Sequence, residues 1–163
     1  MAAWICTVLI GIGGTLAMDA WGLLRRRLFG VPVADYALVG RWLGHMPAGR
    51  FRHGAIARSR VIRGERVLGW CMHYLTGVVF AGALPMVWGT TWLRNPTPGP
   101  AIVVGAVTVA APFLLMQPGM GAGIAASRTP RPGRARLHSV MNHLVFGAGL
   151  YLSALCLSPL CFP

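Results

Sequence analysis

Three ionisable side chains, Asp19, His73 and His143, stand inside apolar stretches where a charge is costly to bury. A carboxylate and two imidazoles could relay protons near neutral pH, ligate a transition metal, or join neighbouring helices by hydrogen bonds. Each lies six or seven residues from an arginine, namely Arg25, Arg66 or Arg136. At about 1.5 Å per helical residue, that spacing places all three about 9 to 11 Å from one arginine layer. We therefore expect them at a single depth of a helical bundle.

Other polar groups accompany this trio. Gln117 lies in a stretch where Pro112, Pro118 and several glycines interrupt helical hydrogen bonding, so a broken helix is expected there. The predicted ligand or proton site comprises Asp19, His73, His143, Gln117, Thr15 and Asn142, of which the first three are also candidate metal ligands. The arginines predicted to bind an anionic lipid headgroup or a haem propionate are Arg66, Arg136 and Arg41.

Four apolar stretches must position these side chains, and they cover about residues 2–24, 67–89, 100–126 and 137–157. Each is long enough to cross the hydrocarbon layer as a helix, and the chain has a mean hydropathy of +0.61. We expect an all-α membrane protein with one four-helix transmembrane domain over residues 1–163. Within the loop 25–66, Leu38, Trp42 and Met46 recur at helical spacing and predict a short cytoplasmic helix at the membrane interface.

Small residues indicate which helix faces pack together. Gly11, Thr15 and Asp19 share one face of the first span, while Gly69, His73 and Gly77 share one face of the second. On the last span, Ser139, His143, Gly147 and Tyr151 recur at the same spacing. We expect these faces to point into the bundle.

The charge pattern predicts the orientation in the membrane. All fifteen basic residues are arginine, and the connections between spans hold ten, one and four of them in chain order. By the positive-inside rule, the arginine-rich loops are cytoplasmic and both termini are periplasmic. The net charge of +12 does not indicate nucleic-acid binding, because the arginines flank the spans. The expected location is a bacterial inner membrane, in contact with lipid.

An internal similarity suggests two parallel helical hairpins. The segment 53–60, HGAIARSR, is similar to 121–128, GAGIAASR, and 66–77, RVLGWCMHYLTG, is similar to 136–147, RLHSVMNHLVFG. A duplication of this kind would relate the two halves by an axis along the membrane normal. It would bring His73 and His143 to equal depth.

Cysteine usage leaves one question open. Cys6, Cys156 and Cys161 fall near the outer ends of the first and last spans, so Cys6 could pair with either of the others in an oxidising compartment. We prefer unpaired cysteines at this stage.

Several motifs together resemble the signature blocks of a bacterial inner-membrane family, domain of unknown function 2938. They are GIGGTLAMD, VGRWLGHM, GRFRHGAIA, GERVLGWCMHYLTG, MQPGMGAGIAASRTP and NHLVFGAGLY, and they extend over nearly the whole chain. The resemblance implies a small polytopic inner-membrane protein. It implies no catalytic residue and no cofactor.

Three functions are compatible with these residues. We prefer a structural or accessory subunit that binds a membrane protein partner or a second copy of itself, with the polar trio joining helices. The second is a proton or metal-cation transporter that uses the Asp/His/Gln site. The third is a redox protein in which His73 and His143 ligate a haem b or a transition metal. Enzymatic activity is not expected, because the serines and histidines match no hydrolase motif.

Overall fold

The computed structural model describes residues 3–162, which are mainly helical and contain no β strand. Four segments are long and apolar enough to cross a membrane: Ala3–Phe29, Glu65–Trp88, Pro98–Met120 and Pro132–Cys161. The prediction of an all-α membrane protein with four transmembrane helices is confirmed. The protein is a multi-pass membrane protein.

The helices differ from the predicted spans mainly at their ends. Helix α1 (Ala3–Phe29) and helix α7 (Pro132–Cys161) extend beyond the apolar stretches into the neighbouring arginines. Arginine is a good helix former, whereas a span predicted from hydrophobic residues ends at the first charged residue. The third span is broken into α5 (Pro98–Thr108), a π-helical turn (Pro112–Met116) and α6 (Gln117–Met120). It ends before residue 126 because Gly121 has a φ of 97°.

The described residues form two compact units. Unit 1 comprises 3–33, 74–108 and 141–162, and unit 2 comprises 34–73 and 109–140. Helices α3 (Glu65–Trp88) and α7 each contribute residues to both.

Unit 1 is packed through small residues on three helices. A Cβ atom at Gly11 of α1 would lie 2.6 Å from the Cα atom of Val78 in α3, and a Cβ atom at Gly149 of α7 would lie 3.0 Å from the Cα atom of Gly14. At the α5 and α7 contact, a Cβ atom at Gly105 would lie 2.8 Å from the Cα atom of Gly147. These helices therefore touch at the level of the backbone, as expected for membrane helices.

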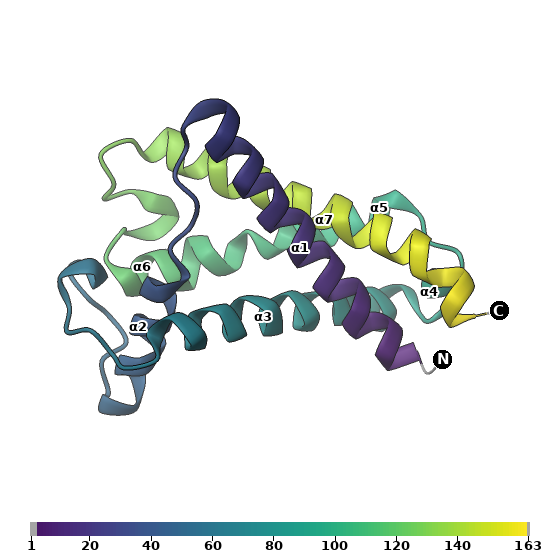
Figure 1. Cartoon of the computed structure of the whole chain (residues 1–163), viewed down its shortest axis with the longest axis horizontal. Coiled ribbons are helices and arrows are strands. Elements are labelled where there is room, and N and C mark those ends of the chain that lie inside the picture. Colours follow the sequence, from purple (N-terminus) through teal and green to yellow (C-terminus); the bar gives the residue numbers. More distant parts are fainter. Residues whose placement is uncertain (1–2, 163) are drawn as a thin grey trace. The chain divides into compact units, whose positions relative to one another are not determined.

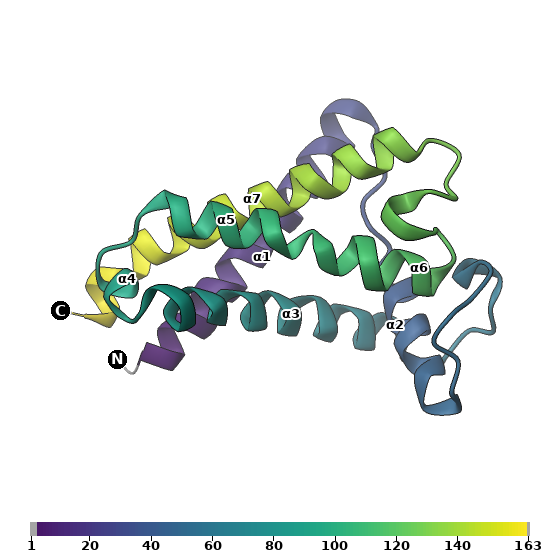
Figure 2. The ribbon, with the colours of Figure 1, turned by 180° about the vertical axis from the view of Figure 1, so that it is seen from behind.

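A disulfide bond joins the ends of unit 1. Cys6 in the first turns of α1 is bonded to Cys161 at the end of α7, and their Cα atoms are 6.2 Å apart. The two ends lie side by side in both views, next to the short helix α4 (Thr91–Arg94) (Figures 1 and 2). The preference for unpaired cysteines was wrong for this pair, because the sequence alone does not bring the two helix ends together. Cys71 and Cys156 are free and exposed.

Unit 2 contains the predicted short helix, α2 (Tyr36–His45), which begins where the Asp35 side chain accepts a hydrogen bond of 3.0 Å from Ala37 N. Gly40 of α2 lies against the first turns of α3, where a Cβ atom would be 2.7 Å from the backbone nitrogen of Gly69. Three 3₁₀ turns follow in this unit, Met46–Ala48, Ile56–Arg58 and Ile124–Ala126. The last two occupy equivalent positions in the two similar segments HGAIARSR and GAGIAASR.

Candidate functional site

Asp19 has a polar partner within unit 1. Tyr74 Oη on α3 donates a hydrogen bond of 2.9 Å to Asp19 Oδ2 on α1. One turn earlier, Thr15 is fully buried, and its hydroxyl donates to Gly11 O at 2.8 Å. The hydroxyl also fills the space beside Gly77, where a Cβ atom would collide with it. Asp19 thus joins α1 to α3, and Thr15 sits at the point where those helices pack most closely.

His143 is fixed by a hydroxyl in the same unit. Thr108 Oγ1 donates to Gly105 O at 2.9 Å and lies 3.0 Å from His143 Nδ1. The Thr108 hydroxyl therefore lies within hydrogen-bond distance of both the imidazole of His143 and the backbone of α5. The neighbouring Asn142 has a buried Oδ1 atom without a hydrogen-bond partner in residues 3–162.

His73 belongs to unit 2 and has aromatic neighbours. Its ring is stacked on Tyr36 with 4.0 Å between centroids, and Trp70 lies at 5.8 Å in an edge arrangement. Tyr36 is the first residue of α2, so the contact packs α2 on α3. The imidazole is therefore part of an aromatic cluster.

Gln117 lies at the break in the third span. Its Nε2 donates to Ser139 Oγ of α7 at 3.3 Å, while its buried Oε1 has no hydrogen-bond partner in the described residues. The segment that follows is not regular helix, since Gly121, Gly123, Ala125 and Ala126 all have positive φ. The discontinuity expected from the prolines and glycines is present.

The predicted ligand set is thus divided between the units. Asp19, Thr15, Asn142 and His143 belong to unit 1, and His73 and Gln117 belong to unit 2. Within residues 3–162, no three His, Cys, Asp or Glu side chains come together in a metal-binding arrangement. The shared site stays a prediction.

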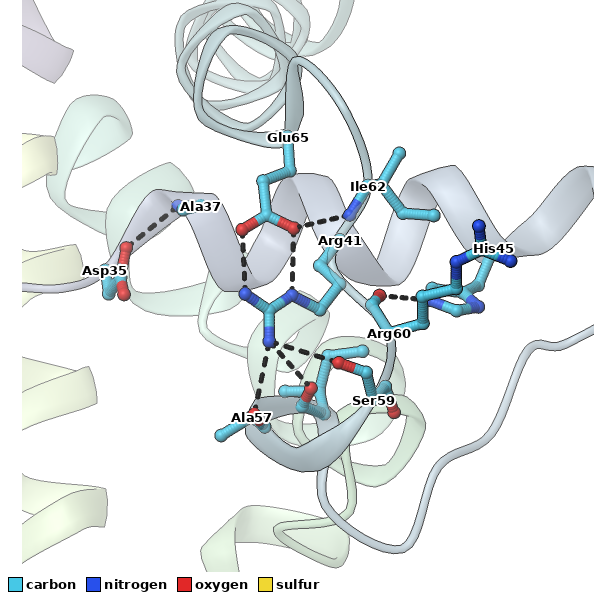
Figure 3. Close-up of polar contacts among 10 residues, drawn as sticks. Asp35, Ala37, Arg41, His45, Ala57, Ser59, Arg60, Ile62 and Glu65 are labelled. Atoms are coloured by element: carbon cyan, nitrogen blue, oxygen red, sulfur yellow. Dashed lines mark hydrogen bonds and ion pairs between the residues drawn. The ribbon is translucent and has the colours of Figure 1, made fainter.

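An ion pair that sequence reasoning missed organises unit 2. Arg41 of α2 donates through Nε and Nη2 to the two carboxylate oxygens of Glu65 at 2.8 and 2.7 Å (Figure 3). Glu65 Oε2 also accepts from Ile62 N at 3.0 Å. The side chains of Arg41 and Glu65 are only 11% and 13% exposed, and the hydrogen bonds with Glu65 raise the pKa of the Arg41 guanidinium above its usual value.

The remaining nitrogen of Arg41 holds the preceding loop. Nη1 lies 3.2 Å from Ala57 O and 3.4 Å from Ser59 O, and the carbonyl of Ile56 is at 3.5 Å. One guanidinium therefore ties α2 to the 56–59 turn and to the first residue of α3 (Figure 3). One feature of the sequence could have indicated this ion pair: Glu65 is the only acid between Asp35 and the end of the sequence, among many arginines.

Of the three arginines predicted to bind an anion, Arg41 is occupied by this network. Arg136 Nε donates to Ala125 O at 2.8 Å, and Arg66 is exposed in the first turn of α3. Different arginines line a surface depression in unit 2 with a volume of about 560 Å³: Arg50, Arg60 and Arg63, together with His45. Arg60 and Arg63 were not singled out from the sequence, because only the folded loop brings them to the same place as Arg50 and His45.

The chain was compared with known proteins. A family model described as "Protein of unknown function (DUF2938)" matches residues 8–157. No curated protein and no solved structure matches the chain.

Proposed function

We propose that this chain, which belongs to the DUF2938 family, is a structural or accessory subunit of a membrane assembly. One observation carries the proposal: each ionisable side chain in the middle of a span is engaged by a side chain of its own unit. The pairs are Asp19 with Tyr74, His143 with Thr108, and His73 with Tyr36. The first two pairs are hydrogen-bonded between helices, and such bonds hold membrane helices together at about 0.6 to 2 kcal/mol each.

The orientation proposed for this subunit has both termini in the periplasm. The arginine count supports it, since loops with ten and four arginines flank one connection that has only Arg94. The Cys6–Cys161 bond supports it independently, because disulfides form and persist in oxidising compartments such as the periplasm. The arginine-rich segments then face the cytoplasm.

The structural role is tested by removing hydroxyl groups singly. Tyr74→Phe should lower the free energy of unfolding in micelles by about 0.6 to 2 kcal/mol, because Asp19 loses a hydrogen bond inside the bundle. The matched control is Tyr151→Phe on α7, since the Tyr151 hydroxyl makes no hydrogen bond within residues 3–162. The control should change stability by less than about 0.5 kcal/mol. Equal effects of both substitutions would contradict the proposal.

A transport assay separates this role from a proton pathway. Reconstituted into liposomes that contain a pH-sensitive dye, the protein should add no proton flux to that of protein-free liposomes. Flux that Asp19→Asn abolishes without changing stability would overturn the structural role and favour a transporter.

The size of the protein in mild detergent is a second test. A subunit of an assembly should migrate as a complex larger than the single chain. Migration as the single chain counts against the accessory role.

Transport is the second candidate because of the broken third span. Gln117 has a buried carbonyl oxygen without a hydrogen-bond partner in the described residues, next to backbone with positive φ at residues 121–126. Transporters use such breaks to present backbone groups to a ligand. Gln117→Leu should abolish flux under this alternative and leave the protein folded. Nothing in either unit favours haem or metal binding over these two.

A further inference from the structure

The depression in unit 2 is positively charged on most of its border. Arg50, Arg60 and Arg63 line it, and His45 of α2 contributes to the lining while being only 7% exposed itself. The guanidinium groups of these three arginines make no hydrogen bond or ion pair with any side chain or carbonyl in residues 3–162. Three cations on the border of one hollow repel one another unless an anion lies between them.

The acids of unit 2 do not neutralise this charge. Glu65 is held by Arg41 and by the backbone of Ile62, and the Asp35 carboxylate caps the first turn of α2. The sequence offers no other acid in residues 34–73 or 109–140. No acid of unit 2 is therefore left to pair with Arg50, Arg60 or Arg63.

The walls of the depression are held in place before any ligand arrives. The imidazole Nε2 of His45 donates to the carbonyl of Arg60 at 2.9 Å (Figure 3). Ile62, which also lines the depression, packs on Gly44 of α2, where a Cβ atom would lie 2.9 Å from Ile62 Cγ2. Arg41 anchors both ends of this loop through Ser59 and Glu65. A preformed site loses less entropy on binding.

We propose that this depression binds a phosphate-bearing anion through Arg50, Arg60 and Arg63. The planar fork of arginine suits phosphate oxygens and forms short, charge-assisted hydrogen bonds with them. The volume of about 560 Å³ leaves room for a phosphate group between the arginines. The phosphate belongs either to an anionic lipid headgroup or to a soluble phosphate compound.

The test uses the full chain in a neutral detergent at fixed ionic strength. Binding of inorganic phosphate and of dioctanoyl phosphatidylglycerol is measured by thermophoresis, with zwitterionic dioctanoyl phosphatidylcholine as the lipid reference. The pocket variant is Arg60→Gln/Arg63→Gln, and the matched control is Arg52→Gln/Arg58→Gln. The control removes two exposed charges from the same segment but none from the lining.

Affinity for the bound anion should fall about tenfold or more in the pocket variant and less than about twofold in the control. If both probes bind, a soluble phosphate is sufficient to occupy the depression. If phosphatidylglycerol alone binds, the ligand is a lipid headgroup. Equal losses in the two variants would mean diffuse attraction to a basic loop and would overturn the site. So would the failure of both probes to bind. An unchanged melting temperature without ligand confirms that the variants are folded.

Discussion

At the scale of single residues, Arg41 has several partners in the loop that precedes α3. Its three nitrogens reach the Glu65 carboxylate, the turn at Ile56–Arg58 and the carbonyl of Ser59. No other side chain type could replace it, because lysine offers a single point charge and cannot form two parallel bonds to a carboxylate.

We expect Arg41→Lys to loosen the loop although it preserves the charge. Amide hydrogen exchange of residues 56–65 should accelerate, because the carbonyls of Ala57 and Ser59 lose their donor. Arg58→Lys, an exposed substitution in the same loop, should leave exchange unchanged. If both substitutions behave alike, Arg41 does not hold the loop.

Residue partners were the least predictable part of the molecule. The depth of Asp19 follows from its spacing to Arg25, yet its hydrogen-bond partner is Tyr74, which counts as apolar when spans are scored. Arg41 was expected to bind an anion and instead pairs with Glu65 across 24 residues. Such pairings depend on how α2 packs against α3, and a local pattern does not contain that information.

At the scale of helices, close contacts between small residues determine the packing of unit 1. The sequence predicted these faces correctly, because glycine spacing in a membrane span directly reflects where backbones approach. Gly11, Gly77 and Gly147 are all buried where helices meet. The end of the third span was less predictable, since it depends on the positive φ of Gly121 rather than on hydropathy.

Two glycines of α3 allow a matched test of this packing. Gly77→Ala should destabilise the protein, because the new Cβ atom would collide with Thr15 Oγ1. The Cβ atom of Gly82→Ala would have no atom within 4 Å. This substitution should therefore leave the free energy of unfolding unchanged or raise it by up to about 1 kcal/mol, because alanine has a higher helix propensity than glycine. Thermal unfolding in micelles measures both. Destabilisation by Gly82→Ala as large as that by Gly77→Ala would contradict the packing argument.

At the scale of the whole molecule, the two similar halves of the sequence acquire structural support. Each of the two equivalent segments contains a 3₁₀ turn, although only the second has positive φ, at Ala125 and Ala126. The segments also meet: His53 N donates to Gly119 O at 2.9 Å, and a Cβ atom at Gly121 would lie 2.7 Å from His53 O. His53 and Gly121 are equivalent positions. Contacts between equivalent positions occur where a two-fold axis passes. The parallel repeat stays a prediction with this observation in its favour.

The bond between Cys6 and Cys161 should contribute substantially to stability. Cys6→Ser is expected to lower the free energy of unfolding by about 2 to 4 kcal/mol, since a long loop is no longer closed in the unfolded chain. Cys161→Ser should have the same effect, and the double variant should add nothing further. Cys156→Ser is the control and should be silent, because this cysteine is free and exposed. Unequal effects of Cys6→Ser and Cys161→Ser would argue against the pairing.

The same bond turns residues 6–161 into a covalent ring. A protease that nicks the ring once, for instance after Arg52, produces two fragments that remain tethered to each other. They should migrate as one band without reductant and as two bands with it. Because the nick lies on the side of the membrane opposite to the tether in the proposed orientation, a chain cut from the cytoplasm stays joined through the periplasm.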